Sequence, residues 1–111
     1  MMDTFENNEY LEQIMGLIMH GGDAKGKAIE AIQAAKQRDF VTAEQKMKEA
    51  NNALVEAHHS QTQLLTDEAK GEHVEPTLLL IHGQDHLMNA ITFIDLAKEI
   101  IDLYKDREQN S

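Results

Sequence analysis

The stretch that decides the fold is LLLIHGQDHLM, residues 78–88, which begins the last periodic segment of the chain. Four apolar residues lead into His82, and Asp85 and His86 follow it at spacings of three and four. Residues three and four apart share one face of an α-helix, so the pattern predicts a helix that carries two imidazoles and a carboxylate together. Core packing alone does not explain why two histidines and a carboxylate gather on one face. A histidine in such a cluster can be a nucleophile, a general base or a metal ligand.

Hydrophobic periodicity extends outward from this stretch over most of the chain. Asp39 is placed to cap a second helix, Gly71 to end it, and Pro76 to lie in the first turn of a third. The sequence therefore predicts an all-α fold, an antiparallel three-helix bundle in a single domain, residues 1–111, with helices over residues 4–36, 40–69 and 76–107.

The third predicted helix has two seams. One is mainly apolar and suits the bundle core: Leu80, Gln84, Leu87, Ile91, Ile94 and Ile101. The second has heptad spacing and a polar middle: Leu78, His82, Asp85, Asn89, Thr92, Leu96 and Leu103. A single small bundle cannot bury both seams, which favours self-association into a coiled-coil-like assembly. The alternative is that the second seam faces water.

Composition excludes several classes of protein. Twenty acidic and ten basic residues give a net charge of −10, which disfavours binding to nucleic acids and to anionic membranes. The absence of cysteine excludes disulfides, thiol catalysis and cysteine–zinc sites. The first ten residues are too polar for a secretory signal, and no apolar run approaches the roughly 20 residues of a membrane span. We therefore expect a cytoplasmic protein.

Two further motifs resemble known sites and have simpler explanations. GGDAKGKA, residues 21–28, resembles a phosphate-binding loop but ends in Ala28 where a magnesium-binding Ser or Thr is needed. Gly21 and Gly22 instead predict a kink or local break in the first helix. HGQDH, residues 82–86, resembles an inverted zinc-protease motif with Asp85 in place of glutamate, and His20, His58 and His59 are possible further ligands. A zinc hydrolase and a non-catalytic scaffold therefore remain as alternatives.

Several motifs together resemble the lactose/cellobiose-specific IIA component of the bacterial phosphoenolpyruvate-dependent sugar phosphotransferase system. The resemblance covers residues 14–104, and its most specific part is LLLIHGQDHLMNAI, residues 78–91. Supporting motifs are GGDAK, DFVTAEQKMKEAN, AHHSQT and LTDEAKGE, which begin at residues 21, 39, 57 and 65.

The resemblance implies a homotrimer of three-helix subunits. It implies that His82 accepts a phosphoryl group from the phosphocarrier protein HPr and passes it to a cysteine of the sugar-specific IIB component, during uptake of a β-linked disaccharide such as cellobiose or lactose. It also implies that Asp85 meets its two symmetry mates at one magnesium ion, or a similar divalent cation, per trimer. Two departures are Lys25-Gly26, where the family commonly has Arg-Ser, and Gly83, where many members have alanine.

Overall fold

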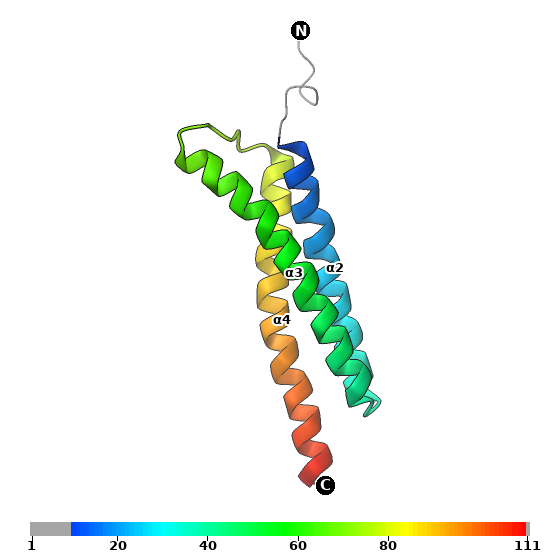
Figure 1. The fold of residues 1–111 in the computed structure, drawn as a ribbon. Helices are drawn as coiled ribbons and strands as arrows, with labels where there is room; N and C mark the ends of the chain where they lie inside the picture. Colours follow the sequence, from blue (N-terminus) through cyan, green and yellow to red (C-terminus); the bar gives the residue numbers. More distant parts are fainter. Residues whose placement is uncertain (1–9, 111) are drawn as a thin grey trace.

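The computed structural model describes residues 10–110, with side chains described from Tyr10 to Glu108. This part of the chain forms three long helices, α2 (Leu11–Lys36), α3 (Phe40–Ala69) and α4 (Leu78–Asn110). Figure 1 shows them side by side in an up–down–up order, so that α3 runs antiparallel to α2 and α4. The predicted all-α three-helix fold is confirmed, while residues 4–9 of the first predicted helix lie outside the described residues.

The local break predicted at Gly21 and Gly22 is wrong, because α2 is one uninterrupted helix from Leu11 to Lys36. A glycine inside a helix costs only about 1 kcal/mol relative to alanine, which tertiary packing can offset. Gly21 is buried in the structure. The glycine pair is therefore accommodated by packing against a neighbouring helix and does not interrupt the backbone.

The turn between α2 and α3 is fixed by backbone hydrogen bonds. Arg38 adopts a left-handed φ of 62°, and the N–H of Asp39 donates to the carbonyl of Ala34 at 2.9 Å. This is the pattern of a Schellman helix stop. Asp39 then caps α3 as predicted, because its Oδ1 accepts a hydrogen bond from the N–H of Thr42 at 3.1 Å.

The connection between α3 and α4 begins and ends with specific caps. Gly71 has a φ of 91°, which confirms its predicted role as a helix stop. Thr77 precedes α4, and its Oγ1 accepts a hydrogen bond from the N–H of Leu80 at 3.1 Å. The prediction that Pro76 lies in the first turn of this helix is wrong. Thr77 is the N-cap, because its hydroxyl satisfies a free N–H group of the first turn, and Pro76 lies just before that cap.

The core is built mainly from alanine, which lets the helices approach closely. Large side chains that are almost fully buried are fewer than the alanines in the described residues, and they include Ile14, Leu17, Leu64, Leu87, Ile94 and Ile101. The alanines buried around them are Ala24, Ala28, Ala31, Ala35, Ala43, Ala50, Ala53, Ala57, Ala90 and Ala97. Val74, from the connection between α3 and α4, joins the core near one end of the bundle beside Leu17 and Leu87.

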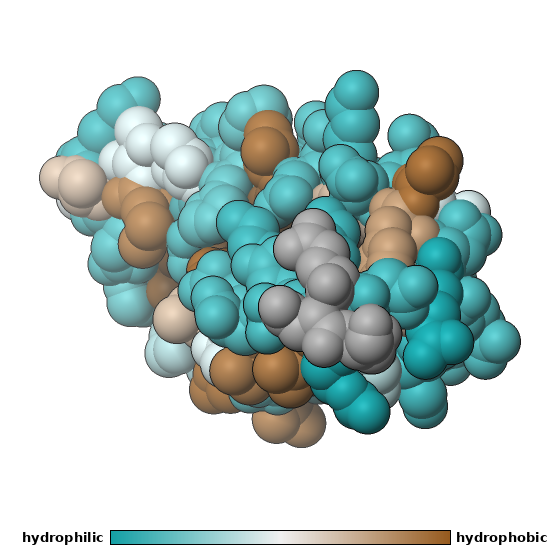
Figure 2. All heavy atoms as spheres, turned by 90° about the horizontal axis from the view of Figure 1, so that it is seen from below, coloured by the Kyte–Doolittle hydropathy of each residue, from teal (hydrophilic) through white to brown (hydrophobic). Residues whose placement is uncertain are grey.

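The second seam of α4 is exposed in the single chain. Leu78 is 83% exposed, Leu96 56% and Leu103 60%, and the polar residues between them also face outward. This open apolar surface is consistent with self-association, but the trimer itself remains a prediction. Figure 2 shows one end of the molecule as largely hydrophilic, with separate apolar patches. Among the described residues, no helix is both long and apolar enough to cross a membrane.

Candidate functional site

The candidate site lies on the exposed side of the first turns of α4. The cap at Thr77 starts the helix, and two exposed apolar side chains, Leu78 and Ile81, lead into His82. His82 is itself exposed. Among the described residues its ring makes no hydrogen bond or ion pair, so neither ring nitrogen is occupied by another protein group. The helix therefore presents an accessible imidazole beside apolar surface.

His86 is the nearest chemical neighbour of His82. The two rings meet edge to face, with centroids 4.4 Å apart and an angle of 64° between the ring planes. The Nδ1 of His86 lies 3.2 Å from the carbonyl oxygen of His82. Because a carbonyl only accepts, this bond places a hydrogen on Nδ1 and leaves Nε2 with the lone pair when the ring is neutral. The bond therefore fixes both the tautomer and the orientation of His86.

Two glycines bring α2 and α4 close together around these histidines. A Cβ atom added at Gly21 would lie 3.1 Å from the carbonyl carbon of His86 and 3.2 Å from its Cβ and oxygen. A Cβ atom added at Gly83 would lie 3.1 Å from the Cβ of Leu17 and 3.3 Å from the backbone oxygen of Ile14. The backbone that carries His82 and His86 is therefore packed directly against α2.

Gln84 lies on the other side of α4 and does not take part in this cluster. Its Oε1 accepts a hydrogen bond from the Nε2 of Gln61 in α3 at 2.9 Å, and both side chains are half-buried. Successive residues of a helix point about 100° apart, so Gln84, two residues after His82, points to another side of α4. Its side chain therefore links α4 to α3, while His82 and His86 share the face near α2.

Asp85 is exposed on the second seam and makes no ion pair or hydrogen bond within the described residues. In this part of the chain, no three His, Asp or Glu side chains come together in a way that could hold a metal ion. A single chain thus offers one free carboxylate at this position.

The remaining histidines lie away from His82 or have other contacts. His20 and His59 line a shallow hollow between α2 and α3 together with Glu56. His59 is an exposed residue whose Nδ1 lies 4.0 Å from a Glu56 oxygen. His58 is exposed on α3, and His73 contacts Glu75 at 3.0 Å in the connection to α4. His59 therefore lies beside α2 and does not join His82 as a further ligand.

Residues 21–28 lie in the middle of α2 and form no loop. A phosphate-binding loop needs a run of free backbone N–H groups, and these residues are within a continuous helix. The resemblance to a phosphate-binding loop therefore has no structural counterpart.

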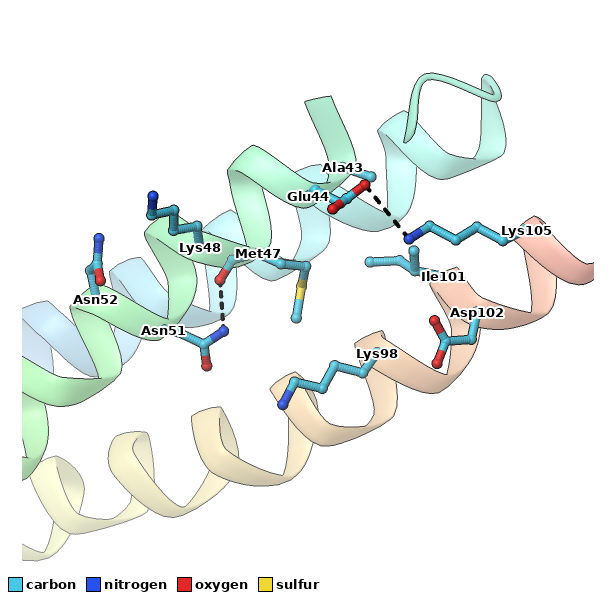
Figure 3. A pocket seen from close by; sticks show the side chains of 10 residues that line it. All are labelled: Ala43, Glu44, Met47, Lys48, Asn51, Asn52, Lys98, Ile101, Asp102 and Lys105. Atoms are coloured by element: carbon cyan, nitrogen blue, oxygen red, sulfur yellow. Dashed lines mark hydrogen bonds and ion pairs between the residues drawn. The ribbon is translucent and has the colours of Figure 1, made fainter. Parts of the chain in front are cut away.

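A second hollow lies between α3 and α4, farther toward the end of α4, and has a volume of about 470 Å³ (Figure 3). Figure 3 shows Met47 and Ile101 extending into it from the two helices, and the Lys105 ammonium reaching Glu44, an ion pair of 3.8 Å. Three lysines and two acidic residues line the hollow: Lys48, Lys98, Lys105, Glu44 and Asp102. The opposite charges nearly balance, so the hollow has no marked preference for an anion or a cation.

Comparison with known proteins identifies what the chain is similar to. The family described as "PTS system, Lactose/Cellobiose specific IIA subunit" matches residues 12–105. The cellobiose-specific EIIA component of Lactococcus lactis is 51% identical over 104 residues, covering 91% of this chain and 90% of that protein. The lichenan-specific phosphotransferase enzyme IIA component of Bacillus subtilis is 52% identical over 99 residues, covering 88% and 90%.

Solved structures give the same relationship. The crystal structure of the cellobiose-specific enzyme IIA from Bacillus anthracis superposes with a TM-score of 0.90 at 47% identity, covering 100% of this chain and 97% of that one. A chain from the solution structure of the chitobiose IIA–HPr complex of Escherichia coli superposes with a TM-score of 0.78 at 37% identity, covering 90% and 97%.

Proposed function

Because the chain belongs to the lactose/cellobiose-specific IIA subunit family of the phosphotransferase system, we propose that His82 is its phosphoryl-carrying residue. The family makes it a phosphotransferase component for sugars of the cellobiose and lactose type. The observation that supports His82 most directly is its exposed, unbonded imidazole on α4, next to a second imidazole of fixed orientation.

The proposed reaction has two steps of the same kind. In the first, a ring nitrogen of neutral His82 attacks the phosphorus carried by HPr, so that a nitrogen–phosphorus bond forms while the bond to the donor atom of HPr breaks. In the second, a thiolate of the IIB component attacks that phosphorus, forming a sulfur–phosphorus bond and releasing His82. Phosphoryl transfer depends mainly on positioning and on stabilising charge, which suits a side chain held on a rigid helix.

HPr is the proposed donor because a similar protein has been solved in complex with it. The surface around His82 offers docking contacts of the usual kind. Leu78 and Ile81 are exposed beside it and can form an apolar centre, with the exposed Asp85 of α4 at the margin. The net charge of −10 also favours partners with a positive contact face.

The homotrimer is part of the same proposal. The second seam of α4 from Asp85 onward would be buried by equivalent seams of two other copies, while Leu78 and His82 at its start stay accessible, and Asp85 would then approach its symmetry mates. Three converging carboxylates repel one another, and a hard divalent cation such as magnesium relieves that repulsion. Asp85 fits this role because its carboxylate is exposed and unpaired in the single chain, and the ion would serve the assembly.

The test of the carrier function is a reconstituted relay. The protein is incubated with phosphoenolpyruvate, Enzyme I and HPr, and its intact mass is measured. We expect the parent to gain one phosphoryl group per chain and to lose it in acid. The His82→Ala protein should gain none, although its helix content is unchanged. His58→Ala and His59→Ala are matched controls on α3 and should accept normally. Phosphorylation of the His82→Ala protein under the same relay would reject the assignment.

The test of the assembly combines sedimentation with metal analysis. We expect a trimer that a chelator weakens, and Asp85→Leu should lose the metal while keeping or gaining trimer stability, because apolar packing replaces a charge cluster. Asp85→Asn binding metal as tightly as the parent would show that the ion lies elsewhere. A stable monomer at micromolar concentration would reject the trimer.

A further inference from the structure

We propose that Gly21 is a positioning residue for the imidazole of His82, and that it acts through His86. This inference rests on the proposed carrier function of His82. Its starting point is that α2 and α4 meet at Gly21 through backbone atoms. The three atoms nearest to a Cβ at this position all belong to His86: its carbonyl carbon at 3.1 Å, and its Cβ and oxygen at 3.2 Å each.

These contacts leave no room for a side chain at residue 21. A Cβ contact of 3.1–3.2 Å is shorter than ordinary van der Waals separation, and two of the three atoms belong to the α4 backbone, which cannot swing aside as a flexible side chain can. Any residue other than glycine must therefore move α4 relative to α2 at His86 by a few tenths of an ångström.

Such a displacement reaches His82 by two routes. The ring of His86 is tied by its Nδ1 to the carbonyl oxygen of His82 at 3.2 Å, and it also meets the ring of His82 at a centroid distance of 4.4 Å. The ring of His82 makes no hydrogen bond among the described residues, so its edge-to-face contact with the ring of His86 bears directly on its position. Moving His86 therefore changes the position from which His82 attacks phosphorus.

The other glycines of α2 supply matched controls. A Cβ at Gly22 would come no closer than 3.8 Å to the ring edge of His86, which is ordinary contact, and a Cβ at Gly26 would meet nothing within 4 Å. All three positions lie inside the same helix, so alanine improves helix propensity equally at each. Differences between the three variants then report contact with His86 and not helix stability.

The experiment measures transfer from phosphorylated HPr to Gly21→Ala, Gly22→Ala, Gly26→Ala and the parent. Small misplacements of a reacting group cost large factors in rate, so we expect Gly21→Ala to lower kcat about tenfold with KM for phosphorylated HPr unchanged. Gly26→Ala should match the parent. Imidazole ¹⁵N shifts of His82 and His86 should move in Gly21→Ala only, with the melting temperature and sedimentation of Gly22→Ala and Gly26→Ala unchanged or improved.

A Gly21→Ala protein with parental kcat and parental ¹⁵N shifts would overturn the inference. If Gly21→Ala does not fold, Gly22→Leu is measured in its place, because leucine at residue 22 puts a larger side chain against the ring edge of His86. Gly26→Leu is then the control. Parental kcat and shifts in Gly22→Leu would then overturn the inference. A parent that accepts no phosphoryl group would instead reject the carrier function, so the two failures are distinguishable.

Discussion

Helix α4 contacts its two neighbours in different ways. Against α2 it packs backbone to backbone, with Gly21 and Gly83 at the closest points and His82 and His86 beside them. Against α3 it leaves a hollow of about 470 Å³, crossed by long side chains such as Met47 and Lys105 (Figure 3). The candidate site lies beside the close contact of α2 with the α4 backbone, and this arrangement fixes a reactive ring more precisely than long flexible side chains can.

The largest expected loss of stability is at the contact between α2 and α4, and a smaller loss is expected at the hollow between α3 and α4. Leu17 is fully buried against Gly83 and Leu87, so Leu17→Ala should destabilise the protein by about 3 kcal/mol. Met47 borders the hollow and is half-buried, so Met47→Ala should cost only about 1 kcal/mol, because no closed cavity remains. Urea denaturation at one fixed protein concentration measures both. Equal losses would show that the two contacts are equally well packed.

A smaller effect is expected at the direct link between α3 and α4. Gln61→Ala and Gln84→Ala each leave one half-buried amide without its partner and should each cost about 1 kcal/mol. The double variant should lose less than the sum, which a double-mutant cycle detects. Both variants should still accept a phosphoryl group, because Gln84 lies on the α3 side. Loss of acceptance in Gln84→Ala would place that side chain in the site.

Acid pH should weaken the helix cap at Asp39 and the ion pair between Glu30 and Lys46, which both lie away from the contacts of α4. The hydrogen bond from Thr42 lowers the pKa of Asp39, and a hydrogen bond from Lys46 lowers the pKa of Glu30. A folded pKa below the unfolded value stabilises the protein above the unfolded pKa, and this stabilisation is lost as pH falls through the folded value. We therefore expect the melting temperature to fall below about pH 4.

The matched variants for this prediction are Asp39→Asn and Asp95→Asn. Asparagine keeps a capping oxygen but does not titrate in this range, so Asp39→Asn should flatten the acid dependence of the melting temperature. Asp95 is exposed on α4, and Asp95→Asn should follow the parent. An unchanged acid slope in Asp39→Asn would show that the cap does not contribute to it.

The smallest effect is expected at the lysines of the hollow. Lys48 and Lys98 line it and form no ion pair within the described residues. Surface substitutions of this kind usually change stability by less than about 0.5 kcal/mol. Lys48→Ala and Lys98→Ala should therefore leave both urea denaturation and phosphoryl acceptance unchanged. Reduced acceptance in either variant would show that the hollow takes part in docking a partner.

The sequence was sufficient for the features that depend on local chemistry. The cap at Asp39 and the stop at Gly71 follow from residue type at a helix end, and they occur as predicted. Periodicity also separated the buried positions of α4, such as Leu87 and Ile94, from the exposed seam that contains His82. These features could be predicted because each involves residues within about one helical turn of one another.

The sequence was misleading where a residue's role depends on another helix. Residue type alone predicts a kink or break at Gly21 and Gly22, but in the structure Gly21 packs against the backbone of His86. Gln84 is a polar residue on the predicted core seam, and only the structure shows that its partner is Gln61 of α3. The sequence feature that could have predicted the packing of Gly21 is a glycine pair inside a strongly periodic segment. Such a pair is compatible with close helix packing as well as with a break in the helix.

Sequence alone was enough for the three helices, the turn between α2 and α3, the outward position of His82 and Asp85 on α4, and the family to which the chain belongs. Three features depend on the folded bundle: Gly21 packs on the backbone of His86, the two imidazoles touch, and a hollow remains between α3 and α4. The physical reason is one of range. Helix periodicity and capping are set by neighbours along the chain, whereas the spacing between helices is set by the sizes of side chains that meet only after the bundle has formed.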